Sequence, residues 1–206
     1  MAVAPLVIAC GALASELRAV LKAQGLAEAV EVTYLPANLH NRPERIVPEL
    51  EPLLDAAAAQ HRSVFVAYAD CGTGGALDAL LERHPEATRL PGSHCYEFFS
   101  GTEQFEAIHE EELGTFFLTD FLAKHFEPLL WQGLGLDRHP QLLDAYFGNY
   151  RRVVLISQTN SEAIIEMGRA AADRLGLEFE HRHVGLGPFT EAVSQGVAVS
   201  LSRRVA

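Results

Sequence analysis

Three cysteines, Cys10, Cys71 and Cys95, are the residues of this chain whose chemistry is most versatile. Each falls at an expected turn and stands next to a glycine or a histidine. Thiolates that converge on one point are ligands that zinc and other borderline divalent metals prefer. The sequence therefore predicts a zinc site made of the three cysteines and His94, with His40 or Glu97 as alternatives for the fourth position. The competing interpretation is that the cysteines are small apolar residues that fill the core.

Cys71 lies in the stretch SVFVAYADCGTGG, Ser63 to Gly75, where an apolar run meets a glycine-rich turn. Consecutive glycines leave backbone N–H groups free to face an anion, so Thr73 and Gly74 are candidate substrate-binding residues. The turn lacks the lysine and the spacing of a P-loop, and glycines that serve geometry alone are the alternative. We take Cys71 as a candidate nucleophile, with Asp70 or Glu97 as the group that carries a proton.

A second polar stretch, LHNRPERI from Leu39 to Ile46, follows the second expected strand. It offers side chains that could hold an anionic substrate, namely His40, Asn41, Arg42 and Arg45. A capped and solvated helix start is the alternative interpretation.

Strand-like and helix-like segments alternate along the chain, which predicts an α/β fold with a mostly parallel, doubly wound sheet of about five or six strands. The expected strands are 5–10, 30–35, 63–68, 88–90, 152–157 and 177–184. The expected helices are 13–24, 43–60, 75–83 and 161–175, with a helical subregion at about 102–148 that includes 102–112 and 114–132. Residues 91–101 are expected to form a loop, and no structure is assigned from residue 190 onward. We expect one domain over residues 1–206.

This fold explains how distant cysteines could meet. Cys10 ends the first expected strand and Cys71 ends the third, and these strands are expected to be neighbours whose carboxyl ends share one edge. Cys95 lies in the loop after the next short strand, which can fold over the same edge.

Composition excludes several classes of protein. The formal net charge of −11 over 206 residues argues against nucleic-acid binding, which needs a basic surface. No apolar run is long enough to span a bilayer, and three cysteines do not make a disulfide framework. We expect a cytoplasmic protein with no membrane partner.

Four stretches, ACGAL (9–13), LPANLHNRPERI (35–46), YADCGTGG (68–75) and PGSHCYEFFSG (91–101), together resemble the family called domain of unknown function 1638. The resemblance implies a bacterial or archaeal protein found among corrinoid-dependent methyltransfer systems for methylamines and betaines. It also makes a corrinoid protein or a methyltransferase a candidate partner.

These observations predict a zinc-binding protein that acts in corrinoid-linked methyl transfer on a small substrate, with self-association as an open question. If it is an enzyme, a metal-dependent methyltransferase is the class expected. Three alternatives stay open: an accessory protein that delivers a metal or cofactor, a metal-free enzyme in which Cys71 is the nucleophile, and a scaffold that docks partners through the phenylalanine-rich region 115–147.

Overall fold

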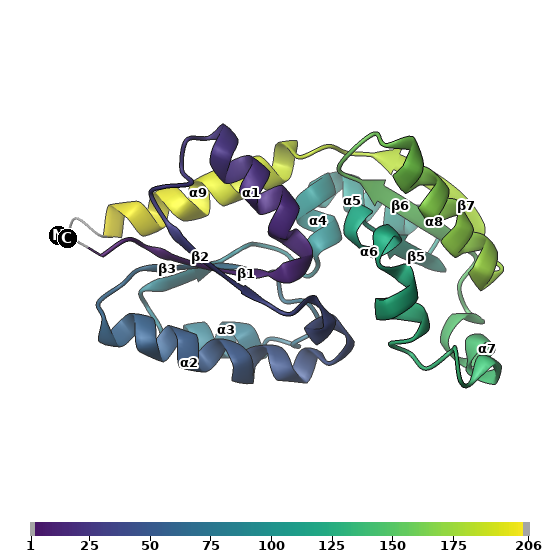
Figure 1. Cartoon of the computed structure of the whole chain (residues 1–206), viewed down its shortest axis with the longest axis horizontal. Helices are drawn as coiled ribbons and strands as arrows, with labels where there is room; N and C mark the ends of the chain where they lie inside the picture. The colour runs from purple at the N-terminus through teal and green to yellow at the C-terminus, as the bar shows by residue number, and fades with distance from the viewer. Residues whose placement is uncertain (1–2, 204–206) are drawn as a thin grey trace. The chain divides into compact units, whose positions relative to one another are not determined.

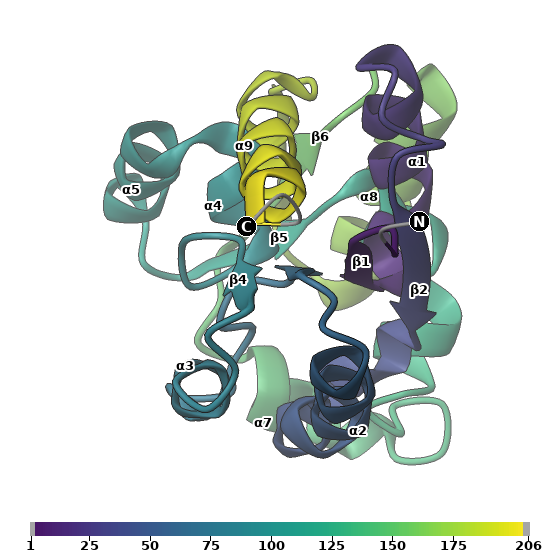
Figure 2. The same ribbon diagram turned by 90° about the vertical axis from the view of Figure 1, so that its left-hand side faces the viewer.

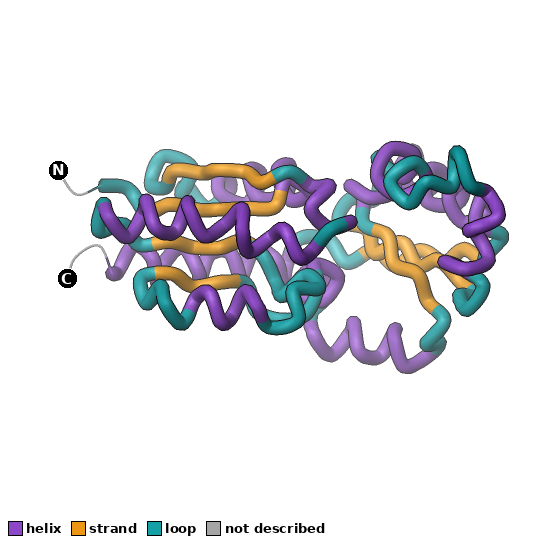
Figure 3. The backbone as a smooth tube through the Cα atoms, turned by 90° about the horizontal axis from the view of Figure 1, so that it is seen from below, coloured by secondary structure: helices purple, strands orange, loops and turns teal. Residues whose placement is uncertain are grey.

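The computed structural model describes residues 3–203, and it is an α/β protein with two separate parallel sheets. The chain divides into two compact units. The first comprises the residues up to Phe98 together with those from Pro188 onward, and the second runs from Phe99 to Gly187. The predicted α/β class with parallel strands is confirmed, and its strands belong to two sheets (Figure 3).

The first unit contains a four-stranded sheet in the order β2-β1-β3-β4, and every neighbouring pair is parallel. Its strands are β1 (Leu6–Cys10), β2 (Glu31–Leu35), β3 (Val64–Ala67) and β4 (Ala87–Arg89). Every residue of β1 and β3 is buried, as expected of central strands that are covered on both faces.

Helices cover both faces of this sheet. Two helices on one face are α1 (Ala14–Ala23) and α9 (Gly187–Arg203), and two on the other are α2 (Ile46–Ala59) and α3 (Ala76–Leu81) (Figures 1 and 2). The chain between β2 and α2 forms two 3₁₀ turns, η2 (Ala37–Asn41) and η3 (Pro43–Arg45), so the helix predicted over 43–60 begins as a 3₁₀ turn and is α-helical from Ile46. A third such turn, η1 (Gly11–Leu13), follows β1, and α4 (Cys95–Ser100) follows the loop after β4.

The second unit contains a three-stranded parallel sheet in the order β5-β6-β7. Its strands are β5 (Thr115–Leu118), β6 (Arg152–Ser157) and β7 (Glu178–His183). Its helices are α5 (Thr102–Glu111), α6 (Asp120–Lys124), a π-helical turn η4 (Phe126–Trp131), η5 (Pro140–Leu142), α7 (Leu143–Phe147) and α8 (Glu162–Leu175).

The core of the second unit forms where α6, α7 and α8 pack on the sheet. Leu118, Val153 and Leu155 from the strands contact Ile164 and Ala172 from α8. All five side chains are at most 4% exposed. This unit therefore has its own apolar core around its own sheet.

Two expectations about single elements were wrong, and one further element lies where no structure was assigned. Residues 115–118 form a strand inside the segment 114–132 that was predicted as helix, because Thr-Phe-Phe-Leu suits a buried strand as well as a helix face. Cys95 begins α4, where a loop was predicted. The unassigned tail is the long helix α9.

Among the helices of residues 3–203, none combines the length and the apolar composition that crossing a bilayer requires.

Candidate functional site

The ends of β1 and β3 lie side by side, and this brings Cys10 and Cys71 to the same edge of the first sheet. The two strands are parallel, with Ala9 opposite Ala67 in the register. The predicted adjacency of these strands is confirmed. Ligands of open α/β sheets bind at the carboxyl ends of the strands, so this edge is the candidate site.

Cys10 is held in a buried turn that directs hydrogen-bond donors at its sulfur. The side chain is 2% exposed, and its Sγ accepts the Ala12 N–H at 3.3 Å. Burial raises the pKa of the Cys10 thiol to about 11, against the lowering effect of the Ala12 amide and the Tyr68 hydroxyl. Gly11 is required at the next position, because a Cβ there would lie 2.9 Å from the Leu35 carbonyl oxygen. Cys10 is therefore a neutral thiol near neutral pH.

His40, from η2, lies between Cys10 and Cys71. Its Nδ1 is 3.1 Å from the Ala37 carbonyl oxygen and 3.6 Å from the Cys10 Sγ. Because a carbonyl can only accept, Nδ1 carries the proton, and the lone pair of the neutral ring is on Nε2. Burial alone would lower the pKa of His40, but the hydrogen bond to Cys71 and its charge raise the pKa overall. His40 is thus an oriented imidazole in contact with the Cys71 side chain.

Cys71 occupies a strained position in the turn after β3. Its φ is 52°, in the left-handed region that favours glycine, and its side chain is partly exposed. Its amide donates to the Ser93 carbonyl at 2.9 Å, and the Asp70 amide donates to the Gly92 carbonyl at 3.2 Å. These bonds fix the turn against the loop after β4. Backbone strain of this kind often accompanies functional sites.

The Asp70 carboxylate stabilises the glycine-rich turn by accepting hydrogen bonds from within it. Its carboxylate accepts the Thr73 hydroxyl at 2.7 Å, the Gly75 amide at 2.9 Å and the Gly74 amide at 3.1 Å. The bond from Thr73, followed by those from the two amides, lowers the pKa of Asp70. The glycine amides are therefore directed at Asp70 rather than outward, and substrate binding by Thr73 and Gly74 stays a prediction. A carboxyl group with a lowered pKa is also a weaker proton carrier near neutral pH than the sequence suggested.

Cys95 begins α4 close to the other two cysteines. Burial raises the pKa of the Cys95 thiol well above its usual value, and the charges of Cys71 and Cys10 raise it further. The three cysteines thus gather at one edge of the sheet. Within residues 3–203, however, no three His, Cys, Asp or Glu side chains are grouped as a metal ion would require. The predicted zinc site is not formed by these side chains as they are placed, and zinc binding stays a prediction.

The other predicted residues belong to the segments that follow β2 and β4. His94 is exposed and stacks on Tyr96 at 6.3 Å between ring centroids. The Glu97 Oε2 accepts the Ser93 amide at 2.8 Å, so Glu97 supports the loop that holds Cys71. Asn41 and Arg42 are exposed, and Arg45 is exposed and paired with Glu49 at 3.1 Å. Their role in binding a substrate stays a prediction.

Two residues of this region were missed. Tyr68 is 1% exposed, and its ring stacks on His40 with 6.2 Å between centroids and an interplanar angle of 11°. Its signal in the sequence was a hydroxyl at the end of an otherwise apolar run. Arg89 binds Asp78 at 2.6 Å and donates to the Leu90 and Gly92 carbonyls, which anchors the loop beside Cys71. No pattern in the sequence distinguished Arg89 from other surface arginines.

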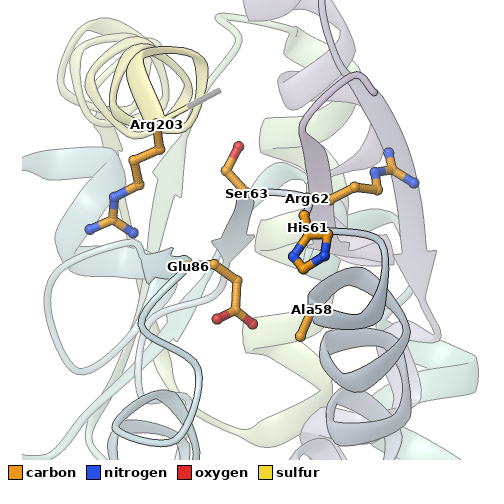
Figure 4. A pocket seen from close by; sticks show the side chains of 6 residues that line it. All are labelled: Ala58, His61, Arg62, Ser63, Glu86 and Arg203. Atoms are coloured by element: carbon orange, nitrogen blue, oxygen red, sulfur yellow. The ribbon is translucent and has the colours of Figure 1, made fainter. Parts of the chain in front are cut away.

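A hollow of about 280 Å³ lies at the opposite, amino-terminal edge of the same sheet (Figure 4). It is lined by Ala58, His61, Arg62, Ser63, Glu86 and Arg203. Its charged groups already have partners in the protein: Arg62 binds Glu31, Glu86 binds His84, and Arg203 donates to the Pro85 carbonyl. We therefore place the candidate site at the cysteine edge.

The second unit has a separate polar network at the carboxyl edge of its sheet. The buried Asp120 carboxylate accepts the amides of Gln158 and Thr159 at 3.2 and 2.9 Å. The Ser157 Oγ lies 2.8 Å from His181 Nε2 and 3.3 Å from His183 Nδ1. These bonds satisfy the buried polar groups of this edge and hold the turn that starts α8.

No curated protein and no solved structure matches this chain significantly. A family model described as "Protein of unknown function (DUF1638)" matches residues 34–193, which cover most of the chain and include His40, Cys71 and Cys95. The chain therefore belongs to the DUF1638 family.

Proposed function

We propose that this protein is a thiol-dependent enzyme in which Cys71 is the nucleophile and His40 is its general base. The observation that carries the proposal is the placement of the Cys71 side chain beside an imidazole that a third group, the Ala37 carbonyl, orients. A nucleophile, a base and a group that orients the base are the parts of nucleophilic catalysis. The substrate is a small molecule with an electrophilic carbon.

Cys71 is better suited to this role than the other two cysteines. The pKa values of Cys10 and Cys95 are raised, chiefly because their thiols are desolvated, so these two thiols stay protonated and react slowly. Cys71 is partly exposed, as Cys95 is, and the imidazole of His40 lies beside it. The methyl transfer expected from the sequence falls within this chemistry, because a thiolate can attack an activated methyl group.

The test is the alkylation of each cysteine by iodoacetamide at pH 7, followed by peptide mass spectrometry. We expect Cys71 to react at least about tenfold faster in the folded protein than in the protein unfolded in urea. The substitution His40→Gln should remove most of this advantage, whereas His61→Gln, at the opposite edge of the sheet, should leave it intact. Equal rates for Cys71 in the folded and unfolded protein would contradict the proposal.

Zinc binding by the three cysteines is the competing proposal, and their gathering at one edge of the sheet is what favours it. Elemental analysis of the same anaerobically purified samples separates the two. About one zinc per chain that is lost in Cys10→Ser, Cys71→Ser and Cys95→Ser, with Cys71 protected from iodoacetamide until a chelator is added, would favour the metal site. Fast alkylation that is indifferent to a chelator would favour the metal-free nucleophile.

A further inference from the structure

Tyr68 carries a buried hydroxyl that, within the part of the chain that the structure describes, makes no hydrogen bond of good geometry, although the Cys10 sulfur lies close to it. The side chain is 1% exposed. The hydroxyl faces the Cys10 sulfur and lies within electrostatic reach of Cys71. Leaving a buried donor unsatisfied costs about 1–3 kcal/mol, so such a group calls for a physical explanation.

The surroundings of Tyr68 show that its hydroxyl is a donor. Burial raises the pKa of Tyr68 far above its usual value, and the charge of Cys10, the contact of the hydroxyl with the Cys10 sulfur and the charge of Cys71 raise it further, so the phenol stays protonated. Its ring stacks on His40, the proposed base, which fixes the hydroxyl relative to the reacting groups. Because the hydroxyl faces Cys10 and the ring stacks on His40, an atom that accepted this hydrogen bond would lie beside the proposed reacting groups.

We propose that Tyr68 donates a hydrogen bond to the carbonyl oxygen of the substrate, and that the substrate of this site is therefore a carbonyl compound such as a reactive acyl derivative. This inference rests on the proposed role of Cys71. It makes Tyr68 a catalytic residue, because its hydroxyl touches the reacting group. It also distinguishes acyl chemistry from methyl transfer, since no oxygen gains charge when a thiolate takes a methyl group.

The chemical step balances with groups that the site contains. The Cys71 sulfur forms a bond to the carbonyl carbon, the thiol proton passes to His40 Nε2, and the π electron pair of the carbonyl moves to its oxygen. That oxygen carries a negative charge, which the Tyr68 O–H stabilises. When the tetrahedral adduct collapses, the carbonyl re-forms, the leaving group departs with its electron pair, and the acyl group stays on Cys71. The proton on His40 returns to the leaving group or to water.

Two electrophiles test this proposal on the full chain, one attacked at a carbonyl carbon and the other at a saturated carbon. p-Nitrophenyl acetate acylates Cys71 through an oxyanion, whereas iodoacetamide alkylates it at a tetrahedral carbon without one. We expect Tyr68→Phe to slow acylation of Cys71 by roughly 10- to 100-fold, somewhat below the loss seen when an oxyanion donor is removed from an evolved enzyme site. Alkylation by iodoacetamide should change less than about twofold, because the thiol and its base are unaltered.

Tyr34→Phe is the matched control, because Tyr34 also has a buried hydroxyl without a partner and belongs to β2 of the same unit. It should leave both rates unchanged. Equal slowing of acylation and alkylation by Tyr68→Phe would make Tyr68 a structural support of His40 and overturn the proposal. Unchanged acylation would overturn it as well. Slow reaction of wild-type Cys71 with both probes would instead contradict the proposed function itself.

Discussion

At the scale of single residues, the left-handed backbone of Cys71 makes a prediction about stability. An L-amino acid loses roughly 1–2 kcal/mol in this conformation, and glycine avoids this loss at an entropic cost of about 0.5–1 kcal/mol. Cys71→Gly should therefore have a free energy of unfolding about 0.5–1 kcal/mol higher than that of Cys71→Ala, as measured by urea denaturation. Both variants lack the thiol, so the difference between their free energies of unfolding reports only the cost of the left-handed backbone conformation.

The sign of this difference is the decisive result, because alanine is the more stabilising residue in an ordinary helix. Ala79→Gly, on the exposed face of α3, should lower the free energy of unfolding by about 0.5–1 kcal/mol. If Cys71→Gly behaved like Ala79→Gly, the turn would not hold position 71 in the left-handed conformation. The only other non-glycine residue with a positive φ in residues 3–203 is His61, at the end of α2, where helix termination explains it.

At the scale of elements, the packing of α9 on β3 depends on one glycine. A Cβ at Gly196 would lie 2.2 Å from Cε2 of Phe65, and Phe65 is 1% exposed and surrounded by core. Gly196→Ala would gain about 1 kcal/mol of helix propensity but would force the helix away from the sheet, at a cost of several kcal/mol. We expect a net loss of about 1–3 kcal/mol in the free energy of unfolding.

The matched control is Gln195→Ala, which changes an exposed residue of the same helix. Its effect on chemical denaturation should stay within about 0.5 kcal/mol. A stabilising effect of Gly196→Ala would mean that propensity outweighs packing and that α9 can shift on the sheet without loss.

The sequence predicted the elements around Cys10 and Cys71 well, because strong local signals coincide there. An apolar run ends at a glycine turn in both cases, and the rules for parallel crossovers then place the two strand ends together. Where signals conflict, the sequence gives a wrong element or none. The pattern of residues 115–118 fits a strand as well as a helix. The helical pattern of α9 is weak and is interrupted by Gly196, but packing of this helix against Phe65 favours the helix over the local pattern.

The composition of the candidate site was only partly predictable. Cys10 ends one strand, and His40 and Cys71 follow two others, so all three could be assigned to one edge from topology alone. Tyr68 looked like a core residue, because an unsatisfied hydroxyl can be recognised only when its surroundings are known. Asp70 was assigned to proton transfer, since nothing in the sequence shows that its carboxylate closes the turn by accepting three hydrogen bonds.

At the scale of the whole molecule, the first unit is completed by the last helix of the chain. Phe189, Val193 and Val197 of α9 are all fully buried, and Phe189 stacks on Phe98 with 5.4 Å between ring centroids. The core of the first sheet thus joins segments from both ends of the sequence.

This connectivity predicts a long-range effect of Val193→Ala. The lost methyl groups and the cavity should cost roughly 2 kcal/mol. Hydrogen exchange should then show faster exchange of amides in β1 and β3, more than 100 residues earlier in the sequence, because α9 covers that sheet (Figure 2). Gln195→Ala should leave these amides protected, and unchanged exchange in Val193→Ala would show that the sheet is stable without the packing of α9.

The return of α9 also sets an order of events during synthesis. The ribosome makes β1 to β4 first, but it must then add residues 99–187 before α9 can emerge. At typical elongation rates this takes roughly 5–20 s, and during this time α9 is not yet available to pack over Phe65 and its neighbours. The nascent chain therefore presents an apolar sheet face to the translation machinery, and its yield in the cell should depend on chaperones that bind such surfaces until the C-terminal helix arrives.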